Sequence, residues 1–85
     1  MATTPYNISI APRAAAQIGT LKPKYRKLIF KLIEALAVNP RPPGAKKIEG
    51  MTGLYSESVS PLRLVYKVEE QEILLLLVRQ HGTGL

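Results

Sequence analysis

Residues 54–79 read LYSESVSPLRLVYKVEEQEILLLLVR and decide the fold. Two short polar breaks divide this stretch into the segments 54–59, 62–68 and 72–79, which are rich in apolar residues. Segments of this length and composition between turn residues are typical of β-strands, and short connections make consecutive strands antiparallel. The sequence therefore predicts three antiparallel strands in the second half of the chain.

The last of these segments has a pattern of its own. The run from Ile73 to Val78 is apolar at every position, without the alternation of a strand that has one solvated face. Six residues are few for a helix, whereas a strand inside a sheet can bury both faces. We therefore expect 72–79 to be the central strand, buried on both faces.

The turn between the first two segments determines which side chains share a face. A tight connection at Ser60-Pro61 places Ser58 opposite Arg63. Ser56 then lies opposite Val65, and directly opposed residues lie on the same face of a sheet. By alternation, the other face takes Glu57, Val59, Leu62 and Leu64. We expect that second face to pack on helices, and Arg63 to lie on the face that the core does not use.

Before residue 54 the apolar spacing indicates one strand and two helices. Tyr6, Ile8 and Ile10 alternate with polar residues, as in a half-buried strand. Residues 13–18 are rich in alanine and predict a short helix, with Pro12 acceptable in its first turn. A longer helix over 22–38 is predicted by an apolar stripe at spacings of three and four, formed by Tyr25, Leu28, Ile29, Leu32, Ile33 and Leu36.

The predicted order is one strand, a two-helix hairpin and three antiparallel strands, which defines a single α+β domain over residues 1–85. A chain of this length has room for one hydrophobic core. The helices are expected to cover one face of a mostly antiparallel four-stranded sheet and to leave the other face, or its rim, for binding. The tyrosines fall on apolar faces and are expected in the core rather than stacked on bases.

The composition restricts the chemistry. Twelve Lys and Arg against six Asp and Glu give a net charge of +6, which favours RNA, DNA or an acidic protein as a partner. The same charge can serve solubility alone. Cysteine is absent and histidine occurs once, which excludes disulfides, thiolate chemistry and a zinc site. We expect no cofactor and no metal.

No stretch of the sequence has the pattern of a targeting or membrane segment. The longest apolar run, 73–78, is far too short to cross a bilayer. Residues 1–5 lack the basic segment and the following apolar run of a signal peptide. We therefore expect a cytoplasmic protein, in keeping with the absence of cysteine.

The stretch from Lys47 to Val68 resembles the core of the RelE-like toxins in the RelE/ParE superfamily. That core typically contains a lysine, a Leu-x-Gly element, a strand of the form Tyr-basic-x-basic, and then Tyr-Arg-hydrophobic-hydrophobic-Tyr. Here Leu62-Arg-Leu-Val-Tyr66 carries most of the likeness, and Arg63 matches the arginine of the Tyr-Arg pair. The order of elements resembles the family along nearly the whole chain.

The resemblance implies a toxin of a type II toxin–antitoxin system. Such toxins enter the ribosomal A site and cleave messenger RNA with basic residues of the sheet, which orient the 2′-hydroxyl, accept its proton and stabilise charge on the phosphate. A RelB-like antitoxin wraps a helical segment over helices and sheet, so a toxin–antitoxin hetero-oligomer is implied. The alternative is a noncatalytic or ParE-like toxin of the same fold that binds DNA gyrase or only its antitoxin.

The sequence departs from the family pattern at its basic strand and after residue 79. The two basic positions are Ser56 and Ser58 here, and serine supplies neither a cation nor a base near neutral pH. Residues 79–85, RQHGTGL, replace a Gly-His-Arg-like element and a C-terminal tyrosine, so we expect a C-terminal helix that is absent or truncated. An RNA endonuclease of reduced activity, or an attenuated variant, fits these departures.

The resemblance selects the candidate site residues, and each has a plainer interpretation. The catalytic candidates are Arg63, Arg79 and His81, and the RNA-binding candidates are Lys46, Lys47, Ser56 and Ser58. Arg63 can instead be a solvated strand residue paired with Glu57 or Glu69. Arg79 can cap the edge of the sheet, and His81, whose residue type suits proton transfer, can simply be exposed. Both lysines can bind backbone phosphates without taking part in chemistry.

Overall fold

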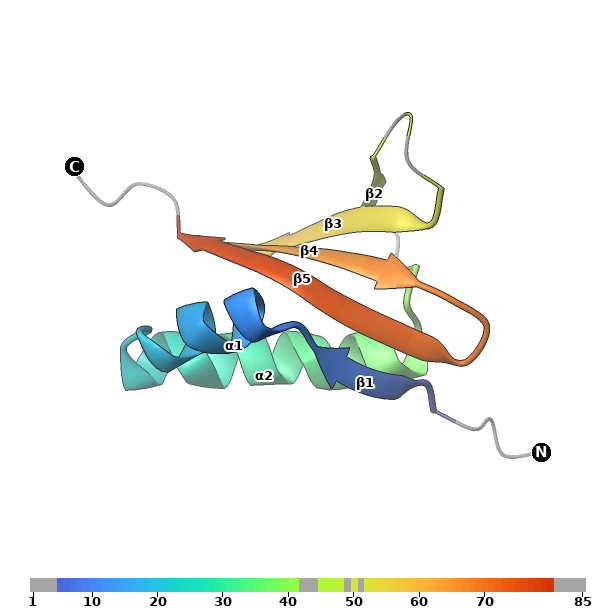
Figure 1. Ribbon diagram of the computed structural model, residues 1–85. Helices are drawn as coiled ribbons and strands as arrows, with labels where there is room; N and C mark the ends of the chain where they lie inside the picture. The colour runs from blue at the N-terminus through green and yellow to red at the C-terminus, as the bar shows by residue number, and fades with distance from the viewer. Residues whose placement is uncertain (1–4, 42–44, 49, 51, 81–85) are drawn as a thin grey trace.

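The structure is a computed structural model that describes residues 5–41, 45–48, 50 and 52–80. It has two layers, because both helices lie on one side of a single sheet (Figure 1). This arrangement confirms the predicted α+β class. In chain order the elements are β1 (Asn7–Ile10), α1 (Pro12–Gly19), α2 (Pro23–Val38), β2 (Lys46–Lys47), β3 (Leu54–Val59), β4 (Leu62–Val68) and β5 (Glu72–Gln80).

Across the described residues the sheet has five strands in the order β1-β5-β4-β3-β2, where the sequence predicted four. The additional strand is β2, which pairs antiparallel with β3 through Lys46 opposite Ser56 and Lys47 opposite Tyr55. Two charged residues have no hydrophobic alternation, so periodicity gives no sign of this strand. At the other edge, β1 runs parallel to β5, with Ile8 opposite Ile73.

The expectation that β5 is central and buried on both faces is wrong. β5 lies between β1 and β4, while β4 holds the central position. Its side chains Ile73, Leu75 and Val78 are buried, whereas those of Leu74, Leu76 and Leu77 are only half-buried. The register shifts between Val65 and Tyr66 of β4, which pair with Leu77 and Leu75. The bulge at Leu76 changes the phase of the side chains, which is why an apolar run without alternation can belong to a strand with one covered face.

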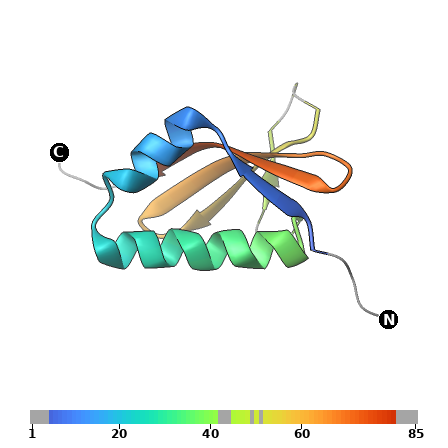
Figure 2. The ribbon, with the colours of Figure 1, turned by 60° about the horizontal axis from the view of Figure 1, so that its bottom comes forward.

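The core fills the space between the sheet and the two helices, which lie across the same face (Figure 2). Leu62 and Leu64 are fully buried there, as the alternation in β4 predicted. Tyr66 is also fully buried, and the other three tyrosines pack against the core, which confirms their expected place. The remaining buried apolar side chains are Ala14, Ile18, Ile29, Ile33, Leu36, Val68, Ile73, Leu75 and Val78.

Prolines begin both helices. Pro12 and Pro23 occupy the first turns of α1 and α2, where a missing N–H costs no intrahelical bond. Along α1, the Oε1 atom of Gln17 accepts a hydrogen bond of 2.8 Å from the backbone N–H of Val78. This bond attaches α1 to β5. It gives the Val78 N–H an acceptor close to the bulge, where the regular hydrogen bonding between β4 and β5 is interrupted.

A glycine sets the start of β3. Gly53 has φ +78°, and a Cβ atom at this position would lie 3.1 Å from the carbonyl oxygen of Val68. The Gly53 carbonyl accepts a hydrogen bond of 2.9 Å from the Val68 N–H. A residue without a side chain is therefore favoured at this point, where the backbone of β3 approaches the end of β4.

Candidate nucleic-acid interface

The side of the sheet turned away from the helices carries most of the predicted site residues, and we call it the open face. Its members on β3, β4 and β5 are Leu54, Ser56, Ser58, Arg63, Val65, Lys67, Glu72, Leu74, Leu77 and Arg79. Ser58 pairs with Arg63, and Ser56 pairs with Val65, as the turn at residues 60–61 predicted. Arg63 in turn pairs with Arg79. Ser58, Arg63 and Arg79 therefore form one row across three adjacent strands.

Arg63 is held in place but is short of hydrogen-bond acceptors. Its side chain is half-buried, and Nη2 donates to the Ser56 hydroxyl oxygen over 3.4 Å, which is long for a hydrogen bond. Its Nε atom is buried and has no hydrogen-bond partner among the residues that the structure describes. A guanidinium stays protonated at all ordinary pH, so this buried donor belongs to a full positive charge. An oxygen acceptor with negative charge is the group that would satisfy it.

The plainer interpretation, in which Arg63 pairs with Glu57 or Glu69, is wrong for both carboxylates. Glu57 stands opposite Leu64 on the helix side of the sheet, and its Oε1 accepts a 3.0 Å hydrogen bond from the Ser58 N–H. The Oε2 atom of Glu69 lies 3.8 Å from Nζ of Lys67. Within the described residues, this contact with Lys67 is the sole ion pair, so Arg63 has no counterion among those residues.

The two serines at the family's basic positions have different environments. Ser56 is 4% exposed, and its hydroxyl accepts a hydrogen bond from Arg63, so it helps to position the Arg63 side chain. Ser58 is exposed beside Arg63. Of the two serines, only Ser58 is therefore open to a ligand.

Arg79 places a second guanidinium beside Arg63. It is exposed, and directly opposed residues have Cβ atoms about 5 Å apart. Like-charged side chains that are directly opposed across two strands repel each other when nothing negative lies between them. The pair therefore favours an anion such as a phosphate, which both guanidinium groups can contact.

The two lysines of β2 face opposite sides of the sheet. Lys46 lies opposite Ser56 and shares the open face with Arg63, whereas Lys47 lies opposite Tyr55 on the helix side. A single RNA site on the open face can therefore include Lys46 but not Lys47. His81 and the expected missing helix lie outside the described residues.

An arginine that sequence analysis missed lies on the helix side of the same edge. The Nε atom of Arg41 donates to the Tyr55 hydroxyl over 3.0 Å, and its Cζ atom lies 5.6 Å from the centre of the Tyr55 ring. The hydrogen bond to Tyr55 raises the pKa of Arg41, with a smaller contribution from Tyr6. In the sequence, only the place of Arg41 directly after the helix-ending Asn39-Pro40 distinguishes it.

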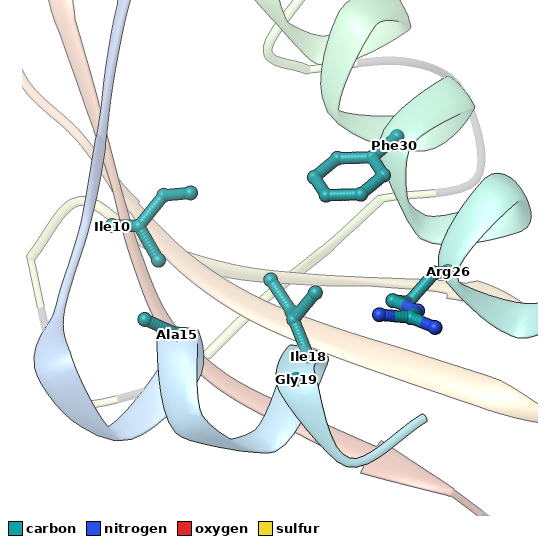
Figure 3. A pocket seen from close by; sticks show the side chains of 6 residues that line it. All are labelled: Ile10, Ala15, Ile18, Gly19, Arg26 and Phe30. Carbon is teal, nitrogen blue, oxygen red and sulfur yellow. The ribbon is translucent and has the colours of Figure 1, made fainter. Parts of the chain in front are cut away.

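The outer side of the helical layer has a small apolar hollow of about 330 Å³. Figure 3 shows Ile10, Ile18 and Phe30 around it, with Ala15, Gly19 and Arg26 completing the lining. Ile10 is 41% exposed and Phe30 is 47% exposed, which is unusual for side chains of this size. The hollow is thus an apolar surface on the face opposite the cationic one.

Two further properties of the described residues bear on the type of site. No three His, Cys, Asp or Glu side chains among them are grouped so that they could hold a metal ion. No helix in the described part of the chain is long and apolar enough to span a membrane.

The fold and the open face define a small α+β protein with a cationic sheet surface, and comparison with known proteins places it in a family. Residues 8–83 match the family of ParE toxins of type II toxin–antitoxin systems, parDE. The chain belongs to this family, within the RelE/ParE superfamily, and is a toxin of a type II toxin–antitoxin system. No curated protein matches the sequence.

Solved structures of related toxins have the same fold. The isolated RelE toxin of E. coli is 23% identical, with a TM-score of 0.81 over 93% of this chain and 87% of that chain. The RelE–RelB complex of Pyrococcus horikoshii gives 20% identity and a TM-score of 0.81 over 96% and 100% of the two chains. The YoeB dimer of Staphylococcus aureus gives 26% identity and a TM-score of 0.74 over 89% and 97%. These matches confirm the predicted RelE-like fold.

Proposed function

We propose that this toxin is a ribosome-dependent endoribonuclease of reduced activity, which cleaves messenger RNA in the A site in the cytoplasm and so inhibits translation. The observation that carries the proposal is the buried Nε of Arg63, which has no hydrogen-bond partner in the described part of the chain and lies beside Arg79 on the open face. Similarity to RelE and YoeB toxins supports it. A messenger phosphate supplies the negative oxygens that this pair of guanidinium groups lacks.

The proposed reaction uses the RNA's own 2′-hydroxyl. Its oxygen loses its proton and attacks the adjacent phosphorus, and a 2′,3′-cyclic phosphate forms. The bond to the 5′-oxygen of the next nucleotide breaks, and this oxygen takes a proton from water to give a 5′-hydroxyl. Arg63 and Arg79 stabilise the negative charge that accumulates on the phosphate oxygens. Ser58 donates a hydrogen bond to the phosphate, and Lys46 binds a neighbouring one.

Proton transfer is the weak part of this site, which is why reduced activity is proposed. Arginine remains protonated and serine is a poor base, so neither can accept the 2′-hydroxyl proton efficiently. We assign this role to His81, because histidine is the side chain that titrates near neutral pH. His81→Gln should then lower the cleavage rate on ribosomes by about 100-fold or more, the usual contribution of a general base.

Primer extension on translated and on free messenger tests the enzymatic proposal. Cleavage is expected only on translated messenger, and Arg63→Ala should abolish it. Arg13→Ala is the control: Arg13 is exposed on α1, and its replacement should leave cleavage unchanged. Ser58→Lys should raise cleavage, because residue 58 is exposed beside Arg63. Ser56→Lys should not raise cleavage, because Ser56 is buried and a lysine at this position has no space to reach a bound phosphate. Absence of cleavage on ribosomes would remove the enzymatic proposal.

The partner that we propose is a RelB-like antitoxin in a hetero-oligomeric complex. The exposed Ile10 and Phe30 around the hollow are apolar surface that such a partner would cover. The related structures include a RelE–RelB complex. Phe30→Glu should weaken capture of the antitoxin in a pull-down and leave the circular dichroism spectrum unchanged. Equal capture by the variant would exclude the hollow from this interface.

A second candidate is a noncatalytic or ParE-like toxin that binds DNA gyrase or only its antitoxin. It is favoured by the two serines at the basic positions, because the described open face then carries guanidinium groups but no base. This candidate would be supported over the first if the purified toxin inhibits supercoiling by gyrase and does not cleave messenger RNA on translating ribosomes.

A further inference from the structure

A second cationic site lies on the helix side of the sheet edge, away from Arg63. It consists of Arg41, Lys47, Tyr55 and Tyr66, and we call it the aromatic corner. Arg41 lies over the ring of Tyr55, which stacks on Tyr66 with ring centres 6.0 Å apart and planes 20° apart. The three side chains therefore form a layered stack from the buried core outward to an exposed guanidinium.

Contacts on both sides of Arg41 fix its position although it is exposed. The buried hydroxyl of Tyr66 donates to the Pro40 carbonyl over 2.7 Å. The Asn39 Oδ1 atom accepts a hydrogen bond of 3.2 Å from the Arg41 backbone N–H. Together with the bond from Nε to Tyr55, these contacts order the side chain before any ligand arrives. A ligand then binds without having to order a long flexible side chain.

Much of the hydrogen-bonding capacity of this guanidinium is left for a ligand. A guanidinium has five N–H donors, and Nε uses one of them on Tyr55. No carboxylate of the described residues pairs with it, since their ion pair joins Lys67 and Glu69. Lys47 adds a second positive charge, because it lies opposite Tyr55 on the same face. The corner therefore favours an anion.

The stack favours a nucleotide over an acidic peptide as the ligand. The Arg41 guanidinium lies over Tyr55, with Cζ 5.6 Å from the ring centre, and arginine planes and aromatic rings are the surfaces on which unpaired bases stack. The edge strand also connects the two sites, because Lys46 points to the open face and Lys47 to the corner. A strand of RNA that leaves Arg63 can follow these positive charges around the two residues of β2.

We propose that the aromatic corner binds one nucleotide of single-stranded RNA, with its phosphate on Arg41 and Lys47 and its base stacked on the Arg41 guanidinium. This inference rests on the proposed RNA-cleaving function and extends it to a second contact outside the reacting site. Arg41 is a binding residue in this arrangement and takes no part in the chemistry.

Binding of a labelled single-stranded 2′-O-methyl oligoribonucleotide, which cannot react through its 2′-oxygen, tests the inference by fluorescence anisotropy. Arg41→Gln should weaken binding about tenfold and lower the slope of log Kd against log salt by about 0.7, the value for one lost phosphate contact on a single strand. Arg41→Lys should keep the slope but weaken binding, because a lysine keeps the charge and loses the stacking plane. Arg13→Gln is the matched control, since it removes the same charge from an exposed position on α1.

The outcomes separate this inference from the proposed function. Equal affinity and equal salt slope for Arg41→Gln and Arg13→Gln would overturn the inference, and cleavage on ribosomes that is lost in Arg63→Ala would then still support the enzyme. Loss of antitoxin capture in Arg41→Gln with unchanged RNA binding would overturn it in favour of an acidic peptide. A wild-type chain that neither binds RNA nor cleaves it would overturn both. Thermal melting of each variant confirms that the fold is intact.

Discussion

Replacing Arg63 with methionine should make the free toxin more stable while it removes RNA cleavage. The arginine has a buried Nε that finds no partner within the described ranges, and leaving such a donor unsatisfied costs about 1–3 kcal/mol. Its like-charged neighbour Arg79 adds a few tenths of a kcal/mol of repulsion. Against this, the variant loses the long bond to Ser56, worth about 0.5–1 kcal/mol at most. The expected net gain is about 1 kcal/mol.

Urea unfolding followed by circular dichroism measures this gain as a shift of the midpoint at constant slope. For a domain of this size, a gain of 1 kcal/mol raises the melting temperature by about 4–8 °C. The matched control is Arg13→Met on α1, whose exposed side chain should change stability by less than about 0.5 kcal/mol. If Arg63→Met instead loses about 1 kcal/mol or more, Arg63 stabilises the fold and is not kept for a ligand.

Three further changes test contacts in the core and the sheet. Gln17→Leu removes the acceptor of the Val78 N–H and should cost about 1–3 kcal/mol in urea unfolding, whereas an unchanged midpoint would mean that water replaces the side chain. Leu64→Ala should cost about 2–5 kcal/mol by the same assay, because Leu64 is fully buried; a loss below about 1 kcal/mol would contradict its place in the core. Burial raises the pKa of Tyr66 to about 12, so the neutral form is favoured by folding and stability is lost as pH rises between about 10 and 12. Relative to Tyr66→Phe, the free energy of unfolding of the wild type should fall by about 1.4 kcal/mol per pH unit in that window. If the two free energies change with pH in parallel, folding does not raise the pKa of Tyr66.

The parts of the fold that depend on local patterns could be predicted from the sequence. The polar turn at residues 60–61 was enough to obtain the register of β3 and β4, including Ser58 opposite Arg63. A side-chain period of two then placed Leu62 and Leu64 in the core. The long helix followed from a stripe of apolar residues, and its end followed from the proline after Asn39.

The parts that depend on pairing across the chain could not be predicted in the same way. β2 exists because β3 supplies a partner for Lys46 and Lys47, and two residues have no periodicity of their own. The bulge at Leu76 is a property of the β4 and β5 pair, so the apolar run alone indicated a doubly buried strand. Arg41 acquires its importance from Tyr55, which is 14 positions away in sequence. For the site, residue types indicated which groups to consider, whereas the partner of each group required the structure.

The parallel pairing of β1 with β5 has a consequence for synthesis of the toxin. Asn7 and Ile8 pair with Glu72 and Ile73, so β1 finds no neighbour in the sheet until a translating ribosome has passed the end of β5. Until then the nascent chain has neither a closed core nor the row of Ser58, Arg63 and Arg79. The ribosome that makes this protein is therefore not exposed to the folded toxin until translation of these elements is finished.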